Sequence, residues 1–181
     1  QRVVHFADKD DPPETSMFSF EKAVSDLSAL VPPSVKVDNF LLGELGMPAA
    51  NESVVSQLNQ GALLYTYVGH GTQDSWSKSH VFDAEDGSAL ANGSRLPVIV
   101  TMNCLNGLFI DVYADSLAEV LQKSPDGGAA AVWASSALTE PYGQGVLART
   151  LYATLFSSPG VRLGDATLAA KAEVKNSDVR R

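Results

Sequence analysis

Short apolar runs separated by segments with helical spacing dominate the pattern along this chain. Four strongly apolar runs predict buried strands: Val3–Ala7, Ala62–Val68, Pro97–Met102 and Gly128–Ala134. Three of them are continuously apolar instead of alternating, which is typical of a parallel sheet covered on both faces. A weaker run of mixed polarity, Val35–Leu42, predicts a strand at the edge of that sheet.

Helical periodicity occupies the segments between the strands. Apolar residues recur at helical spacing in Phe20–Leu30, which stops before Pro32 and Pro33. Ser116–Lys123 opens with Ser-x-x-Glu, a capping box. Further helices are predicted at Asn51–Asn59 (with Asn51 as its cap), Gln144–Phe156 and Gly164–Val174. Strands alternating with helices predict a single α/β domain over residues 1–181, built on an open, mostly parallel sheet flanked by helices.

Composition narrows the class of partner. The 181 residues are 45% apolar and 19% charged, enough for one domain with a core. Thirteen basic residues against twenty-one acidic ones give a net charge of −8, which argues against nucleic acid and against an anionic membrane surface. No apolar run approaches the roughly 18 residues of a membrane span, and no signal peptide is recognisable. The strand-like run at the start of the sequence leads us to expect a piece of a longer chain.

Two chemically competent residues directly follow neighbouring predicted strands. His70 comes after Ala62–Val68, and Cys104, the single cysteine, comes after Pro97–Met102. If these strands pair, their axes lie about 5 Å apart and both side chains reach the same carboxyl edge, where α/β sheets bind ligands. A thiolate there could attack a carbonyl while the imidazole protonates the leaving amine. The pattern alone fits equally well a buried core cysteine and an uninvolved loop histidine.

Four motifs, in order, carry a family resemblance: "NQGALLYTYVGHGTQDSW", "LANGSRLPVIVTMNCLNGLF", "SLAEVLQKSPDGGAAAVWASS" and "LGDATLAAKA". Through them the chain resembles the gingipain-type cysteine peptidases of the caspase-like clan, from about Gly61 to Lys171, with a weaker extension to "VVHFAD". The resemblance implies a caspase-like three-layer sandwich and peptide-bond hydrolysis by a Cys–His dyad. By position, Cys104 is the nucleophile, His70 the general acid/base, and the amides of Gly71 and Cys104 form the oxyanion hole. In this clan the two side chains act on opposite sides of the scissile bond, so they need not touch at rest.

The resemblance further implies a catalytic acid in "FADKDDPPE", after the first strand. Asp8 is the leading candidate and Asp10 the alternative. The same acidic cluster has two other interpretations, a solvated loop or a structural calcium site, because its oxygens suit a hard cation and the family binds calcium. No cofactor is expected for the chemistry itself.

The segment before the first helix differs from that of the arginine-specific relatives, in which an acidic residue there pairs with the substrate guanidinium. Here that segment reads "ETSMFSF" and has no acid between Thr15 and Phe20, so an arginine pocket is not predicted unless Glu14 or Glu140 replaces that acid. Glu140 follows the last strand, where the clan builds its substrate groove; the alternative is a solvated loop residue.

Two further substrate-binding candidates are Thr139, beside Glu140, and Trp76, for which core packing is the favoured alternative. His5 and His80 have no matched partner and are interpreted as non-catalytic. A metal site built from His70, His80 and Cys104 lacks close ligand spacing, and no metal is predicted there.

Two hypotheses therefore stand. The first is a secreted or cell-surface cysteine endopeptidase acting on protein or peptide substrates. Its family implies a partner in a preceding subdomain of the same precursor that this sequence does not contain. The second is a catalytically silent caspase-like domain that serves in binding or scaffolding.

Overall fold

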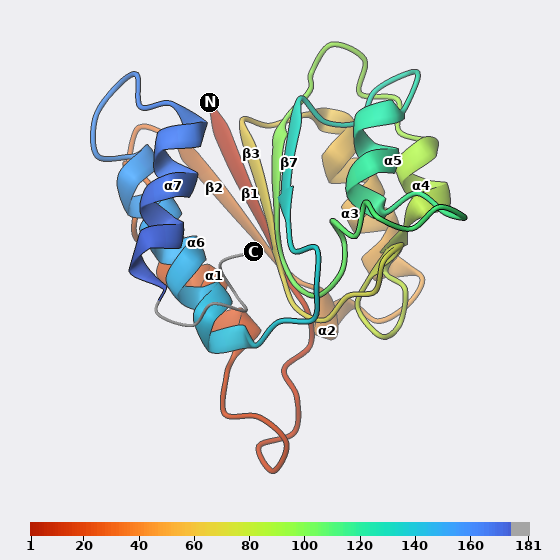
Figure 1. Cartoon of the computed structure of the whole chain (residues 1–181), viewed down its shortest axis with the longest axis horizontal. Helices are drawn as coiled ribbons and strands as arrows, with labels where there is room; N and C mark the ends of the chain where they lie inside the picture. Colours follow the sequence, from red (N-terminus) through yellow and green to blue (C-terminus); the bar gives the residue numbers. More distant parts are fainter. Residues whose placement is uncertain (175–181) are drawn as a thin grey trace.

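A parallel sheet between two layers of helices forms the fold of this chain (Figure 1). The computed structural model describes residues 1–174. The strand order is β2-β1-β3-β6-β7, and every neighbouring pair is parallel. The strands are β1 (Arg2–Ala7), β2 (Lys36–Leu41), β3 (Leu64–Val68), β6 (Val98–Met102) and β7 (Ala131–Ala134). The predicted three-layer α/β class is confirmed.

The helices divide between the two faces of the sheet. Figure 1 shows three of them on one side: α1 (Phe20–Ser28), α6 (Pro141–Leu155) and α7 (Leu163–Glu173). On the other side lie α3 (Ala49–Gln60), α4 (Ala84–Ser88) and α5 (Leu117–Lys123), and the short α2 (Leu42–Leu45) leads into α3. Each face has its own apolar core, so the strands are buried on both sides, as their continuous hydrophobicity predicts.

The strands occur where the sequence predicts them, although β3, β6 and β7 begin one to three residues later than predicted. As expected, β2 is an edge strand. The prediction that Asn51 caps its helix is wrong. Helix α3 begins at Ala49, and the Asn51 amide donates instead to Val81 O at 3.2 Å and to Asp86 Oδ2 at 2.7 Å. Asn51 therefore ties α3 to the segment around α4, a tertiary contact that local capping statistics do not reveal.

Between β3 and β6 the chain forms a small antiparallel hairpin that the periodicity does not indicate. Its strands are β4 (Ser75–Trp76) and β5 (Phe82–Asp83). Each has only two residues, too few to show an alternating pattern. The hairpin matters because it holds the loop that follows β3 at the carboxyl edge of the sheet. Within residues 1–174, no helix is both long and apolar enough to cross a bilayer.

Candidate active site

The register of β3 and β6 brings His70 and Cys104 to equivalent places. Val68 pairs with Met102 at the ends of these two strands, and each site residue lies two positions further on. The Gly69 N–H donates to Met102 O at 3.2 Å, so the ladder continues past the strands. The predicted direct pairing of these strands is confirmed, and both residues lie at the same carboxyl edge.

The His70 imidazole is held by a carboxylate and an aromatic ring. Its Nε2 lies 2.7 Å from Asp11 Oδ2, and the ring meets Phe20 edge to face at a centroid distance of 5.3 Å. One third of the side chain is exposed. Because a carboxylate only accepts, Nε2 carries the proton, and in the neutral ring Nδ1 is left as an acceptor. Within residues 1–174, Nδ1 has no hydrogen-bond partner, so it is available to a substrate.

Asp11 is itself held in its ionised form. Lys78 Nζ donates to Asp11 Oδ1 at 3.1 Å, while His70 occupies Oδ2. Burial by itself would raise the pKa of Asp11, but the hydrogen bonds and charges of Lys78 and His70 outweigh it and lower that pKa below its usual value. The carboxylate facing the imidazole is therefore charged at neutral pH.

Asp8, the leading sequence candidate for the catalytic acid, contacts the backbone of His70 and not its ring. The Asp8 carboxylate is buried and accepts from the N–H groups of His70 at 3.1 Å and Lys9 at 2.8 Å. It also accepts from Ser77 Oγ at 2.8 Å and Tyr67 OH at 3.2 Å. With these four donors, Asp8 fixes the loop that carries His70.

Asp10, the alternative acid, also lies away from the ring. Its Oδ1 accepts from the backbone N–H groups of Phe20 at 2.6 Å and Glu21 at 3.3 Å, at the start of α1. The ring partner is thus Asp11, a residue that the sequence analysis counted within the acidic cluster without assigning it this contact. In the described part of the chain, no three His, Cys, Asp or Glu side chains converge to hold a metal ion, and the calcium site stays a prediction.

Cys104 lies in a tight loop after β6 and remains partly exposed. The Thr139 N–H points at Cys104 Sγ from 3.5 Å, and Thr139 O lies 3.6 Å from the sulfur. The next residue, Leu105, has φ of 65°, a left-handed conformation that a branched residue adopts at a cost. Backbone hydrogen bonds from Leu105 and Gly107 to the segment after β7 hold this turn. The thiol is thereby presented at the surface by a constrained loop.

In the described part of the chain, one backbone N–H group in each of the His70 and Cys104 loops is unused. Gly71 forms an isolated β-bridge with Trp76. The two hydrogen bonds of that bridge are made by the neighbouring residues, from Thr72 N to Ser75 O and from Ser77 N to His70 O, so the Gly71 N–H takes no part in them. In residues 1–174, neither the Gly71 N–H nor the Cys104 N–H donates a hydrogen bond within the chain. Unpaired backbone donors at a partly exposed cysteine are what an oxyanion hole requires.

A relay of amides joins the two loops. Asn103 Nδ2 donates to Asn106 Oδ1 at 2.6 Å, and Asn106 Nδ2 donates to Thr72 O at 2.6 Å and Ser75 O at 3.1 Å. Asn103 and Asn106 are almost fully buried. A Cβ on Gly71 would lie 2.1 Å from Asn103 Nδ2, so only glycine fits between the loops. The relay therefore fixes the Cys104 loop against the His70 loop.

Comparison with known proteins agrees with this geometry. The sequence model described as peptidase family C25 matches residues 1–181. This chain belongs to peptidase family C25. Gingipain R2 of Porphyromonas gingivalis is 30% identical over 88 residues, which are 47% of this chain and 12% of that protein. Gingipain R1 of the same organism is 30% identical over 88 residues, and 9% of it is covered.

Solved structures show that the fold is shared. The crystal structure of the Arg-specific cysteine proteinase gingipain R matches with a TM-score of 0.80 and 18% identity, covering 99% of this chain and 43% of that one. A complex of the pro- and mature domains of Porphyromonas gingivalis RgpB also gives a TM-score of 0.80, with 18% identity. It covers 99% of this chain and 44% of that one. The C25 chain thus spans less than half the length of these two solved chains. Its matched segment covers only about a tenth of the full-length gingipains R1 and R2.

The three substrate-binding candidates of the C25 chain lie in different environments. Trp76 is completely buried and stacks on Tyr67, with centroids 4.5 Å apart, so it packs the core and cannot reach a bound peptide. The Glu140 carboxylate caps α6 by accepting from Tyr142 N at 2.8 Å and Gly143 N at 2.5 Å. Thr139 alone touches the sulfur.

Sequence reasoning missed the amides that support this C25 site. Gln144 Nε2 donates to Asn103 O and to Thr139 Oγ1, both at 2.5 Å, which links α6 to the Cys104 loop. The available signal was two asparagines flanking the cysteine in "MNCLNG". Small amides beside a candidate nucleophile are candidates for positioning it, because each has donors and an acceptor for neighbouring backbone.

Proposed function

We propose that this chain carries the catalytic dyad of a cysteine endopeptidase, with Cys104 as nucleophile and His70 as general acid/base. One observation supports this most directly: a partly exposed thiol and an imidazole occupy equivalent register positions at one sheet edge, and the loops that carry them contain two unused backbone donors. Membership of a peptidase family agrees with it.

The proposed reaction follows from the free positions of these groups. The thiol proton passes to His70 Nδ1, and the Cys104 thiolate forms a C–S bond to the scissile carbonyl carbon. The negative charge that develops on the carbonyl oxygen is accepted by the Gly71 and Cys104 N–H groups. Collapse of this intermediate breaks the C–N bond, and Nδ1 returns the proton to the leaving amine. Water then hydrolyses the thioester and regenerates the thiol.

In this proposal Asp11 takes the role that the sequence analysis gave to Asp8. An ionised carboxylate on Nε2–H fixes the tautomer that leaves Nδ1 free, and it stabilises the imidazolium that forms during proton transfer. Asp8 acts one step further away, by holding the backbone of His70.

For the whole protein we propose a protein or peptide substrate and a location outside the cytoplasm, with a preceding subdomain as structural partner. The support is the family alone, since the relatives are several times longer than the matched segment.

The test is the rate of Cys104 alkylation by iodoacetamide across pH, together with cleavage of a mixed fluorogenic peptide library. We expect alkylation well below the pH at which a free thiol ionises, and its loss in His70→Asn. His80→Asn is the matched control, because His80 is exposed and its φ of 51° suits asparagine. A thiol that reacts like a free cysteine, with no peptide cleaved, would favour the silent module instead.

A further inference from the structure

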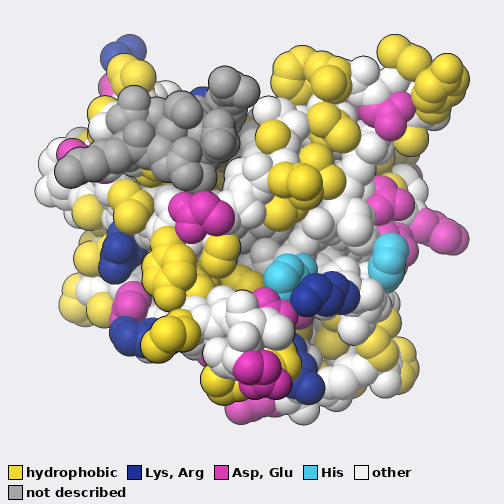
Figure 2. All heavy atoms as spheres, turned by 60° about the horizontal axis from the view of Figure 1, so that its bottom comes forward, with side chains coloured by type: hydrophobic (Ala, Val, Ile, Leu, Met, Phe, Trp, Pro, Cys, Tyr) yellow, Lys and Arg dark blue, Asp and Glu magenta, His cyan; other side chains and the backbone are white. Residues whose placement is uncertain are grey.

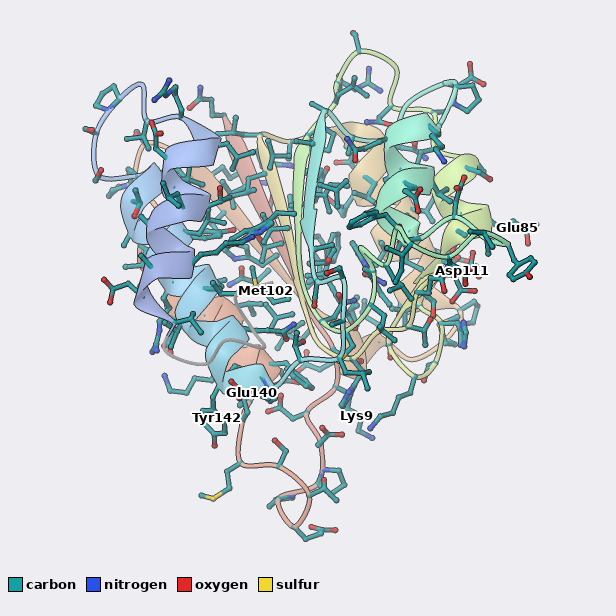
Figure 3. All side chains as sticks on the ribbon, viewed as in Figure 1. Lys9, Glu85, Met102, Asp111, Glu140 and Tyr142 are labelled. Carbon is teal, nitrogen blue, oxygen red and sulfur yellow. The ribbon has the colours of Figure 1, made fainter. Side chains whose placement is uncertain are left out.

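A pocket of about 230 Å³ lies between α1 and α6 at the carboxyl edge of the sheet. Its floor is formed by Val68 and Met102, the last residues of β3 and β6. Its walls come from the segment before α1, from α1 and from α6. Figure 3 shows Met102 on the side of the sheet that faces these helices, and Tyr142 at the start of α6.

The floor of the pocket lies two residues before each member of the proposed dyad. Val68 precedes His70 by two residues, and Met102 precedes Cys104 by two, so each strand leads from the pocket floor to the reacting group. Gln144 lines the pocket and bonds to the carbonyl of Asn103, directly before the nucleophile. A substrate side chain next to the attacked carbonyl is therefore well placed to enter this pocket.

Aromatic contacts extend from the histidine to the pocket wall. The Phe20 ring meets His70 at 5.3 Å and Phe18 at 5.8 Å, and Phe18 meets Tyr142 edge to face at 5.4 Å. Phe18 and Tyr142 line the pocket, and the exposed Met17 lies at its mouth. Figure 2, which turns this edge of the sheet forward, shows hydrophobic side chains gathered on the same face as the exposed histidines.

The charges around the pocket do not suit a cationic side chain. Among the residues that line it, only Lys22, Asp26 and Arg149 are charged. Asp26 is already paired, with Lys22 Nζ 2.7 Å from its Oδ1 on the exposed side of α1. Within residues 1–174, the balance of the lining is one positive charge, and no unpaired carboxylate lines the cavity. A guanidinium or ammonium group entering it would lose its water without gaining a counter-charge.

The size of the pocket indicates one side chain. Pockets that take whole drug-sized ligands measure roughly 300–1,000 Å³, and this one is smaller. Its lining is mostly apolar, so burial there favours an uncharged substrate side chain.

We propose that this pocket receives the substrate residue whose carbonyl is attacked, and that it selects a long neutral side chain such as Leu, Met or Phe over Arg and Lys. The inference rests on the proposed function and specifies the substrate class of the same site. It assigns substrate selectivity to Phe18, Gly145 and Met17, three residues that have no role in the proposed chemical steps.

The test uses fluorogenic peptides that differ only at this residue, carrying Leu, Met, Phe, Ala, Arg, Lys or Asp. We expect kcat/KM to be at least about tenfold higher for the long neutral residues than for Arg or Lys. Matched peptidyl chloromethyl ketones, which alkylate Cys104 with loss of chloride and are detected by intact mass, give the same ranking if turnover is slow.

Two variants connect the ranking to the pocket. In Gly145→Ala, the new Cβ lies 3.1 Å from Phe18 Cε2, which narrows the cavity and should lower kcat/KM for Phe more than for Ala. Gly164→Ala on α7 is the control, because nothing lies within 4 Å of its Cβ. Met17→Asp places a carboxylate at the mouth, where the side chain is 88% exposed and tolerates a charge, and should raise Arg relative to Leu. Leu168→Asp, 70% exposed on α7, controls for net charge.

The outcomes separate the two proposals. Preference for Arg or Lys overturns the neutral pocket and leaves the peptidase standing. A neutral preference that neither Gly145→Ala nor Met17→Asp changes overturns the assignment to this pocket. If Cys104 reacts with no peptide and no ketone, the proposed function fails and the selectivity fails with it.

Discussion

Two histidines in this chain lie in contrasting environments, one suited to a structural role and the other to the catalytic role that we propose. His5, in the middle of β1, is completely buried and its ring is saturated with partners. Its Nδ1 lies 2.8 Å from Asn39 Oδ1 and 3.2 Å from Ser28 Oγ, and its Nε2 lies 2.8 Å from Tyr152 OH. His70 at the sheet edge is one-third exposed and has one nitrogen free. Saturation makes the first a packing element, and the vacant nitrogen makes the second available for proton transfer.

The electrostatic settings differ in the same sense. Burial lowers the pKa of His5 from 6.5 to about 4, against the weaker opposing effect of the Asn39 hydrogen bond, so the ring is neutral at pH 7. The neutral ring donates from Nδ1 to Asn39 and accepts at Nε2 from the Tyr152 hydroxyl, which in turn accepts from Thr66 Oγ1 at 2.7 Å. His70 instead faces the ionised carboxylate of Asp11, which accepts from Nε2–H and leaves Nδ1 as the free nitrogen.

Replacing each histidine with asparagine should give the largest and most clearly opposite effects on activity and stability. His70→Asn removes the proposed proton carrier and should lower kcat/KM by about 10²–10⁴-fold, with the free energy of unfolding nearly unchanged. His5→Asn should leave kcat/KM of the folded protein intact, while orphaned buried partners lower the free energy of unfolding by about 1–3 kcal/mol. Urea denaturation and peptide kinetics on both variants check this. An inactive but fully stable His5→Asn protein would contradict it.

The pH dependence of stability should reveal His5 next. Between pH 6.5 and about 4 the unfolded imidazole binds a proton that the folded one rejects. The contribution of His5 to the free energy of unfolding is therefore fully present above pH 6.5. It falls by roughly 3 kcal/mol as the pH drops toward 4. Urea midpoints measured at several pH values should show a shallower decline in His5→Asn than in the wild type. Parallel profiles would mean that His5 is protonated in the folded state.

The edge residues could be predicted from the sequence because parallel strands converge there. His70 and Cys104 each follow an apolar run, and the Val68–Met102 register places both at the same edge of the sheet. The acid could not be chosen in this way. Asp8, Asp10 and Asp11 lie within four positions of one another, and spacing does not say which one reaches the ring.

Tertiary packing decides between those aspartates. Asp8 is directed inward because the loop after β3 passes closely over it: a Cβ on Gly69 would lie 2.3 Å from Asp8 Cβ. Asp10 is drawn to the first N–H groups of α1. The burial of Trp76 could not be predicted for a similar reason. Its stacking on Tyr67 depends on a hairpin whose strands have only two residues each and therefore no periodic pattern.

Removing the charge of Asp11 should have a smaller effect than removing the imidazole. Asp11→Asn keeps an oxygen that accepts from Nε2–H but loses the charge that, in the proposed mechanism, stabilises the imidazolium. A charge-assisted hydrogen bond contributes about 1.5–3 kcal/mol, which corresponds to a fall in kcat of roughly 10- to 100-fold with little change in KM. Asp10→Asn is the matched control in the same loop. Equal kinetic losses in the two variants would show that loop order, and not the contact to the ring, supports the histidine.

The smallest effect is expected at Lys78, and it sharpens the contrast between edge and interior. Its side chain is 69% exposed and pairs with Asp11 at 3.1 Å, and exposed ion pairs contribute only about 0–1 kcal/mol. Lys78→Met should therefore change kcat less than about fivefold. Because exposed charges are screened, the difference between wild type and Lys78→Met should shrink as salt rises, whereas the effect of His5→Asn on stability should not change. A loss of kcat in Lys78→Met that does not depend on salt would contradict this, because it would show that the ion pair is shielded from solvent.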